Sequence, residues 1–304
     1  MPHLSLNNKT AFITGAARGI GAATAERLHA RGANVALVGL EPERLRANAE
    51  RLGERAIALE ADVTDLAALE AAVARTVERF GSIDVGVANA GVSFTGTLAT
   101  APVEQVERTL AVNLLGVWRT DRALAAEIIH SRGYLLNISS LSAITHAPMM
   151  APYTTAKAGV EAMSDALRME LAAHGAAVGC AYFGFLDTDL VKAGFAMPSA
   201  QNLKERLPRF MANPAPLSIA IDAIERGVAK RSARVWAPRW VGPMIYLRGL
   251  LQPLTERQAL ADMDSLRESV NAAETSTEAA TMDPLLGVAA SVLGEREPSV
   301  TPRG

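Results

Sequence analysis

The chain has 304 residues, enough for one large domain or two small ones with a sizeable buried core. Its net charge is −2, and no basic run is interleaved with aromatics, which argues against a nucleic-acid surface. The single cysteine, Cys180, excludes an internal disulfide and a cysteine-based metal cluster, and we expect no metal site. No apolar run reaches transmembrane length and "MPHLSLNNKT" lacks a signal pattern, so we expect a cytoplasmic protein.

Short aliphatic runs alternate with longer helical patterns between about residues 9 and 240. The expected strands are 11–14, 35–38, 56–59, 85–88, 134–138, 178–182 and 234–236. The expected helices are 19–31, 41–52, 65–80, 103–131, 152–174 and 217–231. Most strands are continuously apolar, as strands covered on both faces are. The sequence therefore predicts an α/β fold with a doubly wound parallel sheet of about seven strands.

The pattern changes after the last expected strand. We expect one domain over 1–237, an extension over 238–271 that serves as a substrate lid or subunit contact, and a flexible tail over 272–304. Aromatic and basic residues in 236–254 could suit a membrane surface. However, we expect the prolines of this segment to break any continuous amphipathic helix, which favours packing over the cleft or a partner subunit.

A glycine-rich turn, "FITGAARGIG", joins the first expected strand to the first expected helix. Gly15, Gly19 and Gly21 suit a sharp turn, a close backbone approach to a pyrophosphate, and tight packing of the helix. The open N–H groups of the helix would face the anion. A glycine turn without a ligand is the alternative, but the strand before and the helix after favour a dinucleotide site.

The turn and five further motifs together resemble the short-chain dehydrogenase/reductase family. The turn has the spacing T-G-x-x-x-G-x-G, and "ADV" (61–63), "ANAG" (88–91), "VNLLG" (112–116), "NISS" (137–140) and "YTTAK" (153–157) follow in family order. The resemblance spans about residues 9 to 240 and implies a Rossmann-like fold that binds NAD or NADP. The cofactor contacts it implies are Thr14, Gly15, Ala17, Arg18, Gly19, Ile20, Gly21, Gly39, Leu40, Glu41, Asp62, Val63, Asn89, Ala90, Gly91, Tyr153, Lys157, Gly184 and Thr188.

The same resemblance implies four catalytic residues. Tyr153 would exchange a proton with the substrate oxygen, and Lys157, one helical turn later, would lower its pKa and bond the nicotinamide ribose. Ser140 would polarise the carbonyl, and the 13-residue interval to Tyr153 favours it over Ser139. Asn113, a mediocre helix former, would hold a water for proton relay.

The choice between NAD and NADP depends on the end of the second strand. Gly39 stands where NAD users keep an aspartate, and Leu40 where NADP users often keep an arginine, so neither pattern is present. Gly39 leaves room for a 2′-phosphate, and Arg18 and Arg44 favour one, whereas Glu41 opposes it. We expect NADP(H) rather than NAD(H), by a narrow margin.

The substrate pocket is expected in the loop after the sixth strand and in the C-terminal region. Met149, Met150, Phe195, Met197 and Phe210 would form an apolar, deformable wall, which favours a lipophilic alcohol or ketone over a sugar. Ordinary packing of a lid is the alternative for these positions.

The loop itself departs from the family pattern at one position. Gly184 and Thr188 match, but Phe183 replaces the proline, and either this ring or Phe185 could line the nicotinamide pocket or pack inside the turn. His146 could touch substrate or lie on the surface.

The pattern thus predicts an oxidoreductase that interconverts a secondary alcohol and a ketone, or a primary alcohol and an aldehyde. We also expect a homodimer or homotetramer. The alternatives are a non-catalytic nucleotide-binding sensor or scaffold of the same fold, which has no reason to keep all four catalytic residues, and a sugar-nucleotide epimerase or dehydratase, whose glycines are spaced differently.

Overall fold

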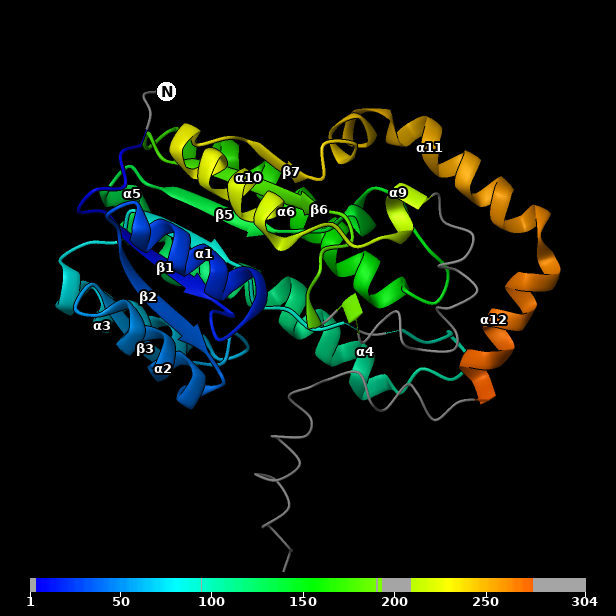
Figure 1. Ribbon diagram of the computed structural model, residues 1–304, viewed down its shortest axis with the longest axis horizontal. Coiled ribbons are helices and arrows are strands. Elements are labelled where there is room, and N and C mark those ends of the chain that lie inside the picture. The colour runs from blue at the N-terminus through cyan, green and yellow to red at the C-terminus, as the bar shows by residue number, and fades with distance from the viewer. Residues whose placement is uncertain (1–3, 94, 190, 193–208, 276–304) are drawn as a thin grey trace, which may run out of the picture.

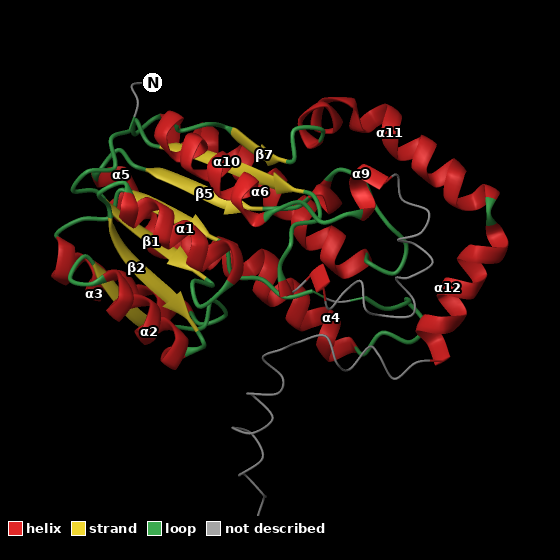
Figure 2. Cartoon of the chain, viewed as in Figure 1, coloured by secondary structure: helices red, strands yellow, loops and turns green. Residues whose placement is uncertain are grey.

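A computed structural model of the chain describes residues 4–93, 95–189, 191–192 and 209–275. Its centre is one parallel sheet of seven strands in the order β3-β2-β1-β4-β5-β6-β7 (Figures 1 and 2). The strands are β1 (Thr10–Thr14), β2 (Asn34–Gly39), β3 (Ala56–Glu60), β4 (Val85–Ala88), β5 (Tyr134–Ile138), β6 (Ala177–Phe183) and β7 (Arg234–Ala237). The predicted fold class is confirmed.

Helices cover both faces of the sheet (Figure 1). One face carries α1 (Gly19–Ala30), α2 (Pro42–Leu52) and α10 (Leu217–Lys230), and the other carries α3 (Leu66–Phe80), α5 (Gly116–His130) and α6 (Ala151–Ala172). Strand β1 supplies both cores, because successive side chains point to opposite faces: Ile13 joins the α1 side and Phe12 the α5 side.

Helix ends follow the signals in the sequence. The Asp65 side chain accepts hydrogen bonds from the amides of Ala67 and Ala68 and caps α3. Gly81 ends the same helix with a positive φ, a conformation that favours glycine. These local signals explain why α3 occupies the predicted span within a residue at its start.

The predicted helix over 103–131 is correct in extent but not uniform. Helix α4 (Val103–Leu110) passes into a π-helical segment, η1 (Ala111–Leu115), before α5 begins. A π-helical turn inside an α-helix is uncommon and often marks a functional site. Here the turn contains Asn113.

The strand order reverses at β1, because β2 lies on one side of it and β4 on the other. In sheets of this kind ligands bind at the carboxyl ends of the strands next to that point. The glycine-rich turn after β1 and the ANAG turn after β4 both lie there.

The C-terminal extension differs from the expectation. Residues Val241–Ala261 form one continuous helix, α11, so the predicted break at the prolines is wrong. Pro243 lies in the first turn, where a missing N–H costs nothing. Pro253 lies on an exposed side, where water can serve the carbonyl that loses its partner.

Helix α12 (Met263–Thr275) follows α11, and the two form an arm beyond the carboxyl edge of the sheet (Figure 1). The first residues of the expected tail, 272–275, belong to this helix. The remainder of that tail, 276–304, lies outside the described residues. Among the described helices, none combines the length and apolar character needed to cross a bilayer.

Candidate active site

The glycine turn after β1 has the shape of an anion cradle. Gly15 has φ +64°, and a Cβ there would lie 2.8 Å from Ala90 Cα. At Gly21 a Cβ would collide with the Gly15 carbonyl, so α1 packs directly on the turn. Gly19 has φ +57°, and a Cβ there would meet nothing within 4 Å. The open space beside Gly19, at the start of α1, fits the pyrophosphate of a dinucleotide.

The turns after β1 and β4 are joined by side-chain hydrogen bonds. The Thr14 hydroxyl accepts from the amides of Asn89 and Ala90 at 3.0 and 3.2 Å. The Asn89 side-chain amide donates to the carbonyls of Thr14 and Gly15 at 2.9 and 3.2 Å. Thr14 and Asn89, both expected to contact the cofactor, thus shape the backbone that would receive it.

Asn113 connects this region to the catalytic candidates. Its side chain accepts from the Val92 amide at 2.8 Å and donates to the Val92 carbonyl at 2.7 Å. A Cβ on Gly91 would lie 3.0 Å from Asn113 Oδ1 and 3.8 Å from Lys157 Nζ. Both polar ends of the Asn113 amide thus engage Val92, and the water of the expected relay stays a prediction.

The ribose end of the expected cofactor site is charged. Glu41, at the start of α2, forms ion pairs with Arg18 at 3.0 Å and Arg44 at 3.2 Å. Asp62 Oδ1 accepts from the Thr64 amide at 2.8 Å. The pair with Arg44 is local, because the two residues are three apart. The pair with Arg18 could not be read from the sequence, because it depends on how the turn after β1 approaches the start of α2.

Gly39 lies at the same end, and a Cβ there would make only ordinary contacts, at 3.8 Å or more. The space beside Gly39 and the guanidinium donors of Arg18 and Arg44 fit a dinucleotide.

The catalytic candidates meet at the carboxyl end of β5 and the start of α6. The Lys157 side chain is 4% exposed, and its ammonium donates to the Ile138 carbonyl at 2.8 Å. Lys157 Nζ lies 5.8 Å from the centroid of the Tyr153 ring. Ser140 follows β5, caps the 3₁₀ turn η2 (Leu141–Ala143), and hydrogen-bonds the Tyr153 side chain.

Ser139 has a different task from Ser140. Its hydroxyl donates to the Lys157 carbonyl at 2.8 Å and so fastens α6 to the end of β5. The structure therefore brings Ser140, and not Ser139, to the Tyr153 side chain.

Burial dominates the electrostatics of the site. Burial raises the pKa of the Tyr153 phenol, and the hydrogen bond from Ser140 acts in the opposite direction. Burial also lowers the pKa of Lys157 to about 8. The expected lowering of the phenol pKa is therefore not produced by the lysine in the protein alone. A further positive charge near the phenol, such as an oxidised nicotinamide carries, would act in the required direction.

The loop after β6 holds the last predicted contacts. Gly184 is packed closely, since a Cβ there would lie 3.1 Å from the Trp240 ring, and its amide donates to the Ala237 carbonyl. Thr188 is half-buried, and its hydroxyl accepts from the Val191 amide at 3.4 Å. Phe183 is buried in the core on the α1 side, so the packing interpretation is correct for it.

Part of the predicted substrate wall lies outside the described residues, namely Phe195, Met197 and the side chain of Phe210. Met149 and Met150 are half-buried just before α6, and His146 is exposed. Within the described ranges, no three His, Cys, Asp or Glu side chains gather closely enough to hold a metal ion.

Comparisons with known proteins agree with this arrangement. Residues 9–198 match the family model described as short chain dehydrogenase. The chain is 32% identical to 2-(R)-hydroxypropyl-CoM dehydrogenase of Xanthobacter autotrophicus, covering 66% of this chain and 84% of the relative. It is 34% identical to trans-4-hydroxycyclohexanecarboxylate dehydrogenase of Sinomonas cyclohexanicum, over 62% and 77%, and to L-rhamnose 1-dehydrogenase (NAD(P)(+)) of a Sphingomonas species, over 63% and 78%.

A solved structure is also similar, that of an alcohol dehydrogenase from Thermococcus sibiricus complexed with 5-hydroxy-NADP. It has 32% identity and a TM-score of 0.57, covering 59% of this chain and 77% of the other. The chain belongs to the short-chain dehydrogenase/reductase family. It is an oxidoreductase of that family with a Rossmann-like fold.

Proposed function

We propose that the protein is an NAD(P)-dependent oxidoreductase that interconverts a secondary alcohol and a ketone, or a primary alcohol and an aldehyde. The observation that carries this proposal is the meeting of Ser140, Tyr153 and Lys157 at the carboxyl end of β5. The turn at Gly91 lies next to Lys157, which joins this group to the cradle expected for the cofactor.

Each residue has a role that its contacts support. Tyr153 donates a proton to the carbonyl oxygen in reduction and accepts it in alcohol oxidation. Ser140 hydrogen-bonds the same oxygen and stabilises the charge that develops on it. Lys157, fixed by the Ile138 carbonyl, places its ammonium beside the phenol. When bound, the nicotinamide accepts or supplies the hydride.

We further propose NADP(H) as the preferred cofactor. Arg18 and Arg44 both lie beside Glu41 at the ribose end and place two guanidinium groups there for a phosphate. Gly39 leaves space for a 2′-phosphate and offers no carboxylate to a 2′-hydroxyl. One similar enzyme is named for NAD(P)(+), and one similar structure contains an NADP analogue.

For the substrate we propose a lipophilic alcohol or ketone. The half-buried Met149 and Met150, immediately before the catalytic helix, support an apolar wall. The substrates named for similar enzymes range from a hydroxycyclohexane carboxylate to a sugar, so they do not narrow the class further.

We also propose a homodimer or homotetramer in the cytoplasm. The exposed apolar side chains of Leu115, Trp118 and Met169 on the outer sides of η1, α5 and α6 support a subunit contact.

The test begins with purified protein, NAD(H) and NADP(H), and a panel of cyclohexanols, long-chain alcohols, steroids, retinoids and small ketones. Tyr153→Phe should then retain cofactor binding and lose turnover, because it removes only the transferable proton. Tyr246→Phe is the matched control, since the Tyr246 side chain is 69% exposed on α11. If Tyr153→Phe keeps more than a few per cent of the wild-type kcat, the assigned role is wrong.

A further inference from the structure

The middle of helix α11, between Tyr246 and Leu254, turns several apolar side chains outward. Tyr246, Leu247, Leu250 and Leu254 are exposed. Arg248 and Gln252, four residues apart and so on one side of the helix, instead contact the rest of the protein. Apolar burial therefore does not explain the position of the middle of α11, whereas the contacts of Arg248 and Gln252 do.

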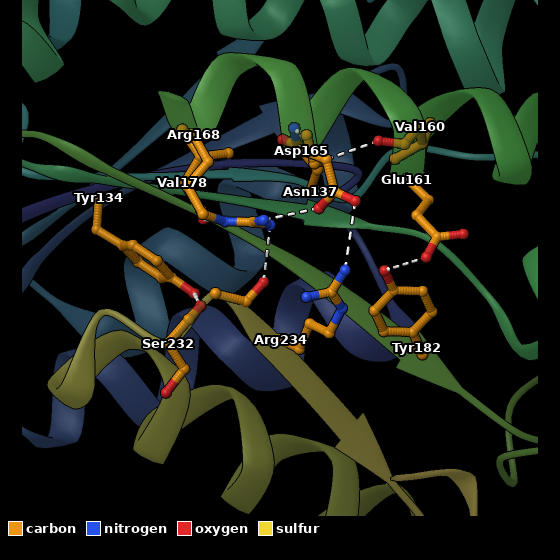
Figure 3. Close-up of polar contacts among 12 residues, drawn as sticks. Tyr134, Asn137, Val160, Glu161, Asp165, Arg168, Val178, Tyr182, Ser232 and Arg234 are labelled. Carbon is orange, nitrogen blue, oxygen red and sulfur yellow. Dashed lines mark hydrogen bonds and ion pairs between the residues drawn. The ribbon is translucent and has the colours of Figure 1, made fainter. Parts of the chain in front are cut away.

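The first contact reaches the catalytic helix. Arg248 Nη1 lies 2.6 Å from Glu161 Oε2, and the Glu161 side chain is only 6% exposed. The Tyr182 hydroxyl donates to the other carboxylate oxygen at 3.0 Å, and Figure 3 shows Tyr182 on β6 facing Glu161 on α6. Glu161 follows Lys157 and Tyr153 by one and two turns of α6. The Arg248 side chain is 49% exposed, so only the Glu161 end of the pair is buried. Removing Arg248 would leave that buried carboxylate without its cation, and the pair therefore links α11 to α6 at this point.

The second contact reaches the segment that carries Ser140. The His146 amide donates to Gln252 Oε1 at 2.9 Å, in the connection between η2 and α6. The beginning of α11 adds apolar contact with the same segment, because Val241 and Ile245 share a buried cluster with Leu141 and Ile144. Helix α11 thus touches both segments that deliver the catalytic candidates.

Between these contacts α11 does not pack closely on α6. A groove of about 480 Å³ separates them, and small residues line it, among them Ala158, Ala162 and Gly249. Arg248 and Gln252 lie along the same groove. With so little side-chain volume between the helices, the two polar bridges set their separation.

We propose that α11 is a strut that holds the Ser140 segment against the catalytic helix, and that Arg248 and Gln252 are positioning residues for the reaction. The inference rests on the function proposed above, because it assumes that Ser140 and Tyr153 act on the same oxygen. A misplacement of about 1 Å in such a pair can cost up to a hundredfold in rate.

The test compares Arg248→Met, which keeps the length of the side chain, with Arg248→Lys, which keeps the charge. Oxidation of cyclohexanol, or of the alcohol in the panel above that reacts fastest, is followed for kcat and KM. Arg248→Met should lower kcat about tenfold, with KM and the Kd for NADPH within about twofold, and Arg248→Lys should recover most of the rate. Arg257→Met, on an exposed position of the same helix, should change none of them.

A second readout needs no substrate. Hydrogen exchange of the backbone amides in 141–150 should quicken in Arg248→Met and Gln252→Met but not in Arg257→Met. Glu161→Gln keeps an acceptor for Tyr182, and its effect should not add to that of Arg248→Met if the two act through one ion pair. Should Arg248→Met fail to fold, Gln252→Met decides by the same measurements.

An unchanged kcat together with unchanged exchange would overturn the strut. Failure of the proposed function looks different. It would appear as a Tyr153→Phe variant that keeps its activity. Backbone hydrogen exchange would still decide whether α11 restrains the segment at 141–150.

Discussion

Asp121→Asn should make the protein more stable at neutral and alkaline pH. Asp121 is buried on α5, where Asn137 on β5 donates a hydrogen bond to its Oδ2 at 2.7 Å. Burial raises the pKa of this carboxyl from the ordinary 3.8 to about 7, and the hydrogen bond from Asn137 opposes the shift. The folded protein therefore retains the Asp121 proton over a range of pH in which the unfolded chain has lost it.

The direction of the pH dependence follows from this difference. Below about pH 4 the carboxyl is protonated in both states and has no effect. Between pH 4 and pH 7 the folded state binds more protons, so the free energy of unfolding falls as pH rises. At about 1.4 kcal/mol for each pH unit, the total loss approaches about 4 kcal/mol, an upper limit because water or local relaxation can relieve a buried charge.

The assay is urea unfolding of the wild type and of Asp121→Asn at pH 5, 6.5 and 8. Asparagine cannot ionise and still offers an oxygen to Asn137, so the stability gained by the variant should grow with pH and approach a plateau above pH 7. Asp264→Asn serves as the control, because the Asp264 side chain is 99% exposed. A stability difference that stays constant from pH 5 to pH 8, or a variant that is less stable at pH 8, would refute the reasoning.

Three further predictions concern the cofactor and the C-terminus. Lys157→Ala should weaken both cofactor binding and kcat, since it removes a ribose partner and the charge beside Tyr153; an unchanged cofactor Kd in a binding titration would contradict this double role. Gly39→Asp has room for its side chain and should disfavour NADP relative to NAD by about tenfold or more, through like-charge repulsion of ~1–3 kcal/mol. A wild type that already strongly prefers NAD would refute the preference for NADP(H) and point to Glu41 as the ribose ligand. Ending the chain at Thr275 should leave the melting temperature within a few degrees and activity on a small ketone unchanged.

Much of the fold could be predicted because buried parallel strands have a distinctive pattern. A continuous aliphatic run such as 35–38 is typical of a strand covered on both faces, and the structure extends it by one residue at either end. The catalytic candidates were located through the family resemblance. The spacing of four on a helix explains only why Tyr153 and Lys157 lie on one side of α6.

The parts that could not be predicted depend on contacts between distant residues. The ion pair of Arg18 with Glu41 joins two turns that the sheet brings together, and no local sequence pattern predicts it. The same holds for α11. Sequence reasoning takes apolar side chains as the inward face of a helix, whereas here Leu250 and Leu254 point outward and Arg248 makes the contact.

The strand end "NISS" (137–140) connects the candidate site to the buried Asp121. Its residues contact different partners in turn: Asn137 bonds Asp121, the Ile138 carbonyl accepts from Lys157, Ser139 bonds the Lys157 carbonyl, and Ser140 bonds Tyr153. This short stretch ends the strand and begins a turn. Its side chains and carbonyls together connect β5 to both α5 and α6. A charge on Asp121 would therefore act one residue from the Ile138 carbonyl, which accepts from the proposed catalytic lysine, Lys157. The polar contacts beneath α6 therefore link the packing of the fold to the proposed site.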